Sequence, residues 1–185
     1  MRVISGKCKR MLLRVPSGMH TRPTTDRIKE TLFNILQHDI PDSIFLDLFS
    51  GSGGIGIEAL SRGAKEAVFV DDNKEAVRCI KENLTHTGLT NQGVVMKIDA
   101  VNALKRLEKS DYRFDIIFMD PPYENNIMQN MLQILQISRS VKENTMIIME
   151  ASLNTSVQNL ERLGFSIIRV KEYKTNQHIF MKVSC

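Results

Sequence analysis

Hydrophobic positions before residue 44 predict a hairpin followed by one helix. Residues 2–16 alternate between apolar and polar side chains around Gly6, which is typical of a short β-hairpin. After a loop at residues 17–25, Thr25 is positioned to cap a helix over residues 26–39. The apolar side chains of that helix fall on one face, namely Ile28, Leu32, Ile35 and Leu36.

From residue 44 onward, short apolar runs alternate with helical stretches. The expected strands cover residues 44–49, 66–72, 93–99, 114–120, 145–151, 165–173 and 177–183. The expected helices cover residues 54–63, 74–88, 100–110, 127–138 and 156–164. This alternation predicts βαβ units, and therefore an α/β fold with a mostly parallel, doubly wound sheet covered by helices on both faces. The last two strands would form a hairpin that adds an antiparallel strand at one side.

Composition indicates a single globular domain. The chain has 185 residues, of which 42% are hydrophobic and 25% charged, and we expect residues 1–24 to form a basic N-terminal hairpin and loop on a core over 25–185. No apolar run approaches the roughly 20 residues that span a bilayer, and charges interrupt the N-terminus, so we expect a cytoplasmic protein. The three cysteines form no CxxC pair, so we expect no metal and no disulfide framework. We also expect a monomer.

Positive charge is concentrated at the N-terminus. The first 30 residues hold eight Lys or Arg against two carboxylates, a net charge of +6, while the rest of the chain carries −2. Such a segment is either an arm that contacts the phosphates of a nucleic acid or a solvated basic hairpin. The candidate substrate-binding residues are Lys7, Lys9, Arg10, Arg22 and Arg27.

A glycine-rich turn follows the strand at residues 44–49. Gly51, Gly53 and Gly56 form a G-x-G-x-x-G pattern between that strand, which carries Asp47, and the next helix. Glycines allow a tight turn and let a ligand approach the backbone closely. The pattern fits a dinucleotide and S-adenosylmethionine equally, and it also fits a plain strand-to-helix turn.

Carboxylates follow the next two strands. Asp71 lies about 20 residues after Gly51, where an acidic side chain can accept hydrogen bonds from both hydroxyls of a ribose. Asp72 or Asn73 would then cap the following helix. Asp99, followed by Ala100, could accept a hydrogen bond from an adenine amino group, although a helix cap explains it equally well.

The most specific signal is Asp120-Pro121-Pro122-Tyr123, which follows the strand at residues 114–120. Two prolines fix the backbone in an extended turn and so aim Asp120 and the Pro121 carbonyl. Tyr123 offers a flat face on which a base can stack. An exocyclic amine of guanine or adenine is a poor nucleophile, because its lone pair is delocalised. Two acceptors on its N–H groups favour a pyramidal nitrogen, and Asp120 can take the proton that leaves.

These motifs resemble the RsmD family of class I methyltransferases. The resemblance rests on RVISGKCKR, TRPTTDRIKETLFNIL, DLFSGSGGIGIEALSRGA and DIIFMDPPY, which lie between residues 2 and 123. The TRPTTDR segment is the most particular to the family. The resemblance implies a Rossmann-like fold and S-adenosylmethionine as cofactor. It implies contacts to the methionine part by Asp47, Gly51 and Gly53, to the ribose by Asp71, to the adenine by Asp99 and Ala100, and to the target amine by Asp120 through Tyr123.

The activity that the resemblance implies is methylation of the exocyclic N2 of a guanine in the RNA of the small ribosomal subunit. An adenine-N6 methyltransferase acting on DNA or RNA is the main alternative, since Asp-Pro-Pro-Tyr serves that amine equally well. A nicotinamide-dependent oxidoreductase would use the same glycine pattern, but nothing in Asp-Pro-Pro-Tyr performs hydride chemistry. A non-catalytic RNA-binding assembly factor is the third alternative. Arg22 and Arg27 either contact RNA or order the loop beside the cofactor.

Overall fold

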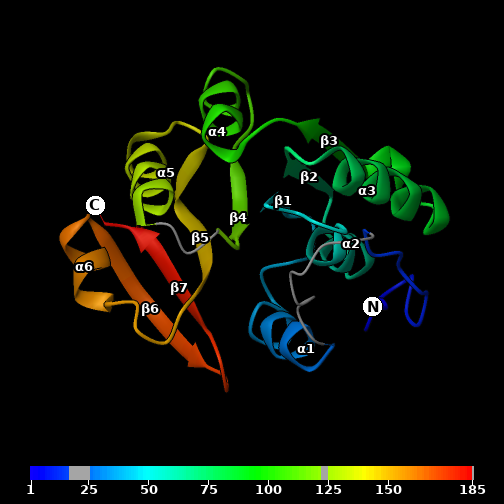
Figure 1. The fold of residues 1–185 in the computed structure, drawn as a ribbon, viewed down its shortest axis with the longest axis horizontal. Coiled ribbons are helices and arrows are strands. Elements are labelled where there is room, and N and C mark those ends of the chain that lie inside the picture. The colour runs from blue at the N-terminus through cyan, green and yellow to red at the C-terminus, as the bar shows by residue number, and fades with distance from the viewer. Residues whose placement is uncertain (17–25, 122–124, 185) are drawn as a thin grey trace.

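A seven-stranded sheet in the order β3-β2-β1-β4-β5-β7-β6 forms the centre of the molecule (Figure 1). The computed structural model describes residues 1–16, 26–121 and 125–184. The first five strands run parallel, and β7 is antiparallel to both of its neighbours. The strands are β1 (Ile44–Leu48), β2 (Glu66–Asp71), β3 (Gly93–Lys97), β4 (Phe114–Met119), β5 (Val141–Ala151), β6 (Phe165–Glu172) and β7 (Gln177–Val183). The mostly parallel α/β sheet with an antiparallel C-terminal strand, predicted from the sequence, is confirmed.

Helices cover both faces of the sheet. Side chains of α1, α2 and α3 pack on one face around Phe45 and Phe69, and those of α4, α5 and α6 pack on the other around Leu46 and Met149. The helices are α1 (Asp26–Ile35), α2 (Gly54–Ser61), α3 (Lys74–His86), α4 (Ala100–Glu108), α5 (Asn125–Ile137) and α6 (Val157–Arg162), with a short 3₁₀ helix η1 (Thr90–Gln92). No helix within the described ranges is long and apolar enough to cross a membrane.

The strand order reverses between β1 and β4. β1 pairs with β2 on one side and with β4 on the other. The connection that follows β1 and the connection that follows β4 therefore leave in opposite directions. In open α/β sheets a ligand binds in the crevice that this reversal creates beyond the carboxyl ends of the strands. The fold therefore directs attention to the residues that follow β1, β2, β4 and β5.

The predicted N-terminal hairpin is confirmed as a short one. Its two arms pair antiparallel at Arg2 and Leu12, and backbone amides of Val3 and Leu13 donate to the carbonyls of Met11 and Met1 at 2.9 and 3.0 Å. Between them, the backbone of Lys7 donates to the Ser61 carbonyl at 2.8 Å, which attaches the turn to the end of α2. Gly6, at φ +82°, passes so close to Ser61 that a side chain would collide with its backbone. Contacts with α2 thus attach the turn of this hairpin to the core.

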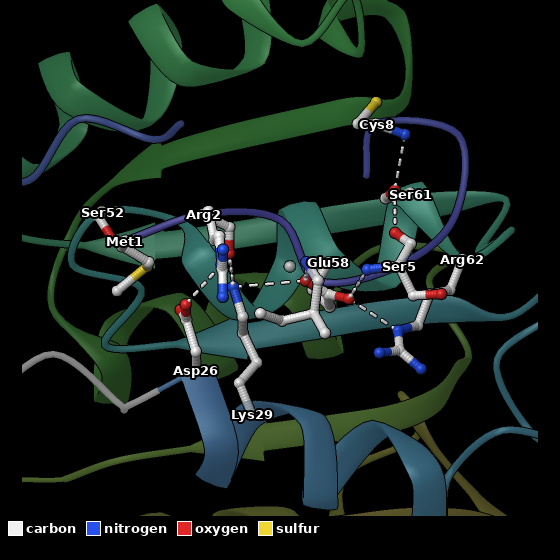
Figure 2. Close-up of polar contacts among 12 residues, drawn as sticks. Met1, Arg2, Ser5, Cys8, Asp26, Lys29, Ser52, Glu58, Ser61 and Arg62 are labelled. Atoms are coloured by element: carbon white, nitrogen blue, oxygen red, sulfur yellow. Dashed lines mark hydrogen bonds and ion pairs between the residues drawn. The ribbon is translucent and has the colours of Figure 1, made fainter. Parts of the chain in front are cut away.

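Glu58 of α2 fixes this N-terminal segment (Figure 2). Its fully buried carboxylate accepts hydrogen bonds from the backbone amides of Ile4 at 2.7 Å and Ser5 at 3.0 Å. Arg62 donates to it at 2.8 Å, and the buried Lys29 ammonium of α1 lies 3.4 Å away. Burial lowers the pKa of Lys29, which Glu58 opposes. One carboxylate therefore joins the first residues of the chain to two helices.

Most boundaries lie within two residues of the prediction, and two others differ from it by four residues. The first helix ends at Ile35 instead of residue 39, and hydrogen-bonded turns take over its last residues. The strand predicted from residue 145 begins at Val141. Val141 pairs with Phe114 of β4, and an irregularity separates this pair from the regular pairing that starts at Met146 and Ile116. The proposed cap Thr25 lies outside the described residues.

Candidate active site

A cavity of about 1290 Å³ lies at the carboxyl ends of β1, β2, β4 and β5. Residues in the last positions of these strands or directly after them contribute to its wall, and so do α1 and the turn between β6 and β7. Asp47, Gly51, Asp71, Asp120 and Pro121, all proposed from the sequence, line it. The topology has thus brought together groups that lie up to 74 positions apart in the chain.

The glycine loop begins with a strained aromatic residue. Phe49 lines the cavity at φ 63°, a left-handed conformation that bulky residues rarely adopt. Ser50 stabilises the reversal, since its Oγ donates to the Asp47 carbonyl at 2.6 Å and accepts from the Val70 amide at 2.9 Å. At Gly51, φ is +55° and an added Cβ would meet no atom within 4 Å. The backbone of Gly51 is therefore open to a ligand.

The second glycine of the loop faces the protein instead. Gly53 has φ +78° and precedes α2, and an added Cβ would lie 3.3 Å from Ile80 and 3.4 Å from Ile57. It does not line the cavity. Gly53 therefore packs within the turn, while Gly51 faces the cavity, and the proposed contact of Gly53 with a cofactor stays a prediction.

Asp47 is buried beneath this loop. Its Oδ2 accepts from the Gly56 amide at 2.9 Å, and its side chain is only 1% exposed. Burial raises the pKa of Asp47 to about 7, with smaller contributions from the charges of Asp71 and Asp120. A buried carboxylate beside open space is poised to face a positively charged ligand group, which would favour its ionised form.

Asp71 joins the glycine loop to the end of β2. One carboxylate oxygen accepts from the Gly51 amide at 2.8 Å and the other from the Asn73 amide at 2.9 Å. Burial raises the pKa of Asp71, and these two hydrogen bonds oppose the shift. A carboxylate can accept about four hydrogen bonds, so both oxygens keep free lone pairs. Asn73 is the cap of α3, because its side chain accepts from the amides of Glu75 and Ala76.

Asp99 acts as a helix cap in the structure. It accepts from the Asn102 amide at 3.0 Å and from the Asn102 side chain at 2.8 Å. These hydrogen bonds lower the pKa of Asp99. Neither Asp99 nor the buried Ala100 lines the cavity. Their proposed role toward an adenine stays a prediction.

Asp120 follows β4 at the floor of the cavity. Asp120 is exposed as a whole residue and lines the cavity. Burial and, secondarily, the nearby Glu150 carboxylate raise the pKa of Asp120 to about 7. Near neutral pH this carboxyl can both hold and release a proton, as a general base requires. Pro122 and Tyr123 lie outside the described residues.

Sequence reasoning missed a polar cluster on the β5–β7 side of the cavity. Asn176 donates through Nδ2 to Oε1 of Glu150, and His178 Nε2 lies 3.3 Å from Oε2 of the same carboxylate. His178 is fully buried, and its Nδ1 lies 3.2 Å from the Tyr173 hydroxyl. Glu150, Tyr173 and Asn176 line the cavity. The position of Glu150 near the end of an expected strand was the available signal.

The basic candidates separate into two places. Arg27 of α1 lines the cavity. Lys7, Lys9 and Arg10 are exposed and lie near the Ser61 end of α2, one helix length or about 12 Å from the glycine loop. Lys7 donates to the Gln92 side chain at 2.6 Å. Arg22 lies outside the described residues. No group of three or more His, Cys, Asp or Glu within the described part of the chain could hold a metal ion.

Comparisons with known proteins agree with this architecture. The family model described as Conserved hypothetical protein 95 matches residues 1–182. YlbH of Bacillus subtilis is 38% identical over 172 residues, covering 93% of this chain and 92% of that protein. Ribosomal RNA small subunit methyltransferase D of Haemophilus influenzae is 37% identical, covering 80% and 77%. The solved structure of yhhF from Escherichia coli superposes with a TM-score of 0.84 at 28% identity, covering 100% of this chain and 98% of that one.

Sheet order, glycine loop and strand-end carboxylates define a Rossmann-like class I methyltransferase, and the chain is an enzyme of this class. More narrowly, it belongs to the Conserved hypothetical protein 95 family, which is the RsmD family of methyltransferases. The family resemblance predicted from the sequence is thereby confirmed.

Proposed function

We propose that this enzyme transfers a methyl group from S-adenosylmethionine to the exocyclic N2 of a guanine in small-subunit ribosomal RNA. The observation that carries the proposal is the single cavity wall that joins the glycine loop, Asp71 and Asp120. Relatives of 32–37% identity carry the name ribosomal RNA small subunit methyltransferase D, which supports RNA of the small subunit as the acceptor.

The residues present suit this cofactor. The open backbone at Gly51 would accept the methionine part, together with the buried Asp47 carboxylate. The free lone pairs of Asp71 would accept the ribose hydroxyls. S-adenosylmethionine supplies an electrophilic methyl group on a positively charged sulfur. The raised pKa values of Asp47 and Asp71 are consistent with a cofactor site that gains a positive charge when it is filled.

Asp120 would orient and deprotonate the amine. Its carboxylate and the carbonyl of Pro121 accept the two N–H groups, which turns the nitrogen lone pair toward the methyl group. As the new N–C bond forms, the bond between the methyl carbon and the sulfur would break and its electron pair would stay on the sulfur, which becomes neutral. The nitrogen would become positively charged, and Asp120 would accept its surplus proton. The base must leave its stack to reach this depth, at a cost of a few kcal/mol that is smallest in a loop or bulge.

Transfer of a labelled methyl group tests the activity. The protein and labelled S-adenosylmethionine are incubated with one of three acceptors. These are small ribosomal subunits from cells that lack the protein, the RNA extracted from those subunits, and duplex DNA. We expect label in the subunit or its RNA and none in DNA. Thermal unfolding of the protein with each ligand is the second measurement. A rise of the unfolding midpoint with NADH but not with S-adenosylmethionine would instead favour an oxidoreductase.

We expect Asp71→Ala to weaken S-adenosylmethionine binding by about 1.5–3 kcal/mol, the range for hydrogen bonds to a charged group. The variant loses both the ribose acceptor and the hydrogen bond to the Gly51 amide. Titration calorimetry measures the loss. Asp72→Ala is the matched control, because this neighbouring carboxylate also lines the cavity but accepts no hydrogen bond from the glycine loop. Equal affinities for Asp71→Ala and wild type would remove Asp71 from the site.

We expect simultaneous substitution of Lys7, Lys9 and Arg10 by Ala to weaken RNA binding and to reduce its salt dependence. Each lost phosphate contact lowers the slope of log K against log salt by about 0.7–0.9. The control substitutes Lys105, Arg106 and Lys109, which carry the same charge on α4 and the segment that follows it. Binding assays over a salt series compare the two. If the variant of Lys7, Lys9 and Arg10 had the same slope of log K against log salt as the control, these residues would form only a solvated surface.

A further inference from the structure

Glu150 lies beside Asp120 across two neighbouring strands. β4 and β5 run parallel and pair Met119 with Met149, so Asp120 and Glu150 are the next residues on each and face the same side of the sheet. Neighbouring strands lie about 4.8 Å apart. The edge of one base can therefore reach both carboxylates.

The cluster holds Glu150 in one orientation. Asn176 binds one carboxylate oxygen, and His178 lies 3.3 Å from the other. When His178 donates from Nε2 to Glu150, its Nδ1 can accept from the Tyr173 hydroxyl at 3.2 Å. One neutral tautomer of the imidazole therefore satisfies both contacts. The Glu150 side chain is 12% exposed, and each oxygen keeps a lone pair for a ligand. Glu150 is thus rigid and able to accept.

Asn176 adds a second acceptor to this wall. Its Nδ2 is used on Glu150, and its buried Oδ1 has no hydrogen-bond partner among the described residues. Asn176 is 7% exposed and lines the cavity. A buried acceptor without a donor is costly, so this part of the wall favours a ligand that brings N–H groups.

We propose that Glu150 selects guanine, by accepting the N1–H of the base whose N2 amine is bound at Asp120. In guanine the atom beside the amine-bearing carbon is N1–H, a donor. In adenine the corresponding N1 is an acceptor, which would face the carboxylate lone pairs. The inference rests on the proposed function and deepens it, since it explains why this site takes guanine. Asn176 and His178 act through Glu150 as positioning residues.

Glu150→Gln is the first test. Glutamine keeps an oxygen for Asn176 but can turn its amide N–H toward the base. We expect kcat/KM for methylation of small-subunit RNA to fall about 5- to 150-fold, the discrimination given by a good base contact. Affinity for S-adenosylmethionine and the thermal midpoint should stay at wild-type values. Glu161→Gln, which alters an exposed carboxylate of α6 outside the cavity, is the control and should keep wild-type kcat/KM.

The second test replaces the methylated guanine by 2-aminopurine, which carries the same amine but has a bare acceptor at N1. We expect the wild-type enzyme to have a higher kcat/KM for guanine than for 2-aminopurine. In Glu150→Gln the ratio of these two kcat/KM values should be about 5- to 150-fold smaller, because the amide of glutamine can donate to the bare N1. An unchanged ratio, whether or not both rates fall, would overturn the assignment. If wild type formed no N2-methylguanine at all, the proposed function would fail instead.

Discussion

Asp120→Ala should lower methyl transfer at least ~10²-fold, the low end of what a positioned acid–base group supplies, while the fold and S-adenosylmethionine affinity stay nearly intact. Asp120 follows β4 in the cavity, beside Glu150, and makes no hydrogen bond that any neighbouring element depends on within the described ranges. Its loss should therefore affect kcat and not cofactor binding. Single-turnover rates with small ribosomal subunits, together with calorimetric affinities, measure the two effects separately.

Asp120→Asn separates orientation from proton removal. Asparagine keeps an acceptor oxygen for the amine but cannot take its proton. If orientation dominates, the Asn variant retains much more activity than the Ala variant, and if proton removal dominates, both are equally poor. Full activity in both variants would mean that the Asp-Pro-Pro-Tyr motif only ends a strand.

The pH dependence of the wild-type enzyme should follow from the same carboxyl. Because burial and Glu150 raise the pKa of Asp120 to about 7, the proton-accepting form increases as the pH rises through that value. We expect the single-turnover rate to rise with pH and to level off at or below about 7, because the positive charge of bound S-adenosylmethionine favours the ionised carboxyl. The Asn variant should lack this rise, and an identical rise in the variant would assign it to another group.

Glu58→Ala should lower the free energy of unfolding by about 3–5 kcal/mol, the cost of breaking a buried ion pair by removing one partner. The variant leaves the fully buried Lys29 without its carboxylate and the amides of Ile4 and Ser5 without their acceptor. Denaturant unfolding measures the loss. Glu82→Ala is the control, since it removes an exposed partner of Arg14 and should cost no more than about 1 kcal/mol.

A double variant distinguishes the buried charge from general disruption. Adding Lys29→Met to Glu58→Ala removes the uncompensated ammonium, so part of the stability should return. The N-terminal amides would still lack their acceptor, so recovery should be incomplete. A double variant less stable than Glu58→Ala would contradict this account of the network.

Much of the site followed from one regularity of the sequence. Asp47, Asp71 and Asp120 were found because each lies within or at the end of an expected strand, and parallel strands present their carboxyl ends at one edge. The same reasoning applied to residues 145–151 would have found Glu150. Its partners could not be found in this way, because His178 reaches Glu150 only through the insertion of β7 between β5 and β6.

The N-terminal segment shows what local patterns leave out. Its alternation predicted the short hairpin that forms, but not that the backbone of Ile4 and Ser5 binds a carboxylate more than 50 residues away. Such tertiary contacts leave no periodic trace in the sequence. Gly6, and the polar Glu58 and Ser61 in a mostly apolar helix, were the local signs.

Mass spectrometry of the methylated nucleoside tests the central claim most directly. Small ribosomal subunits from cells lacking the protein are treated with the enzyme and S-adenosylmethionine, and the RNA is digested to nucleosides. We expect a single new product, N2-methylguanosine, that is formed by wild type and reduced at least ~10²-fold with Asp120→Ala. N6-methyladenosine as the product, or N2-methylguanosine formed equally by both proteins, would contradict the account.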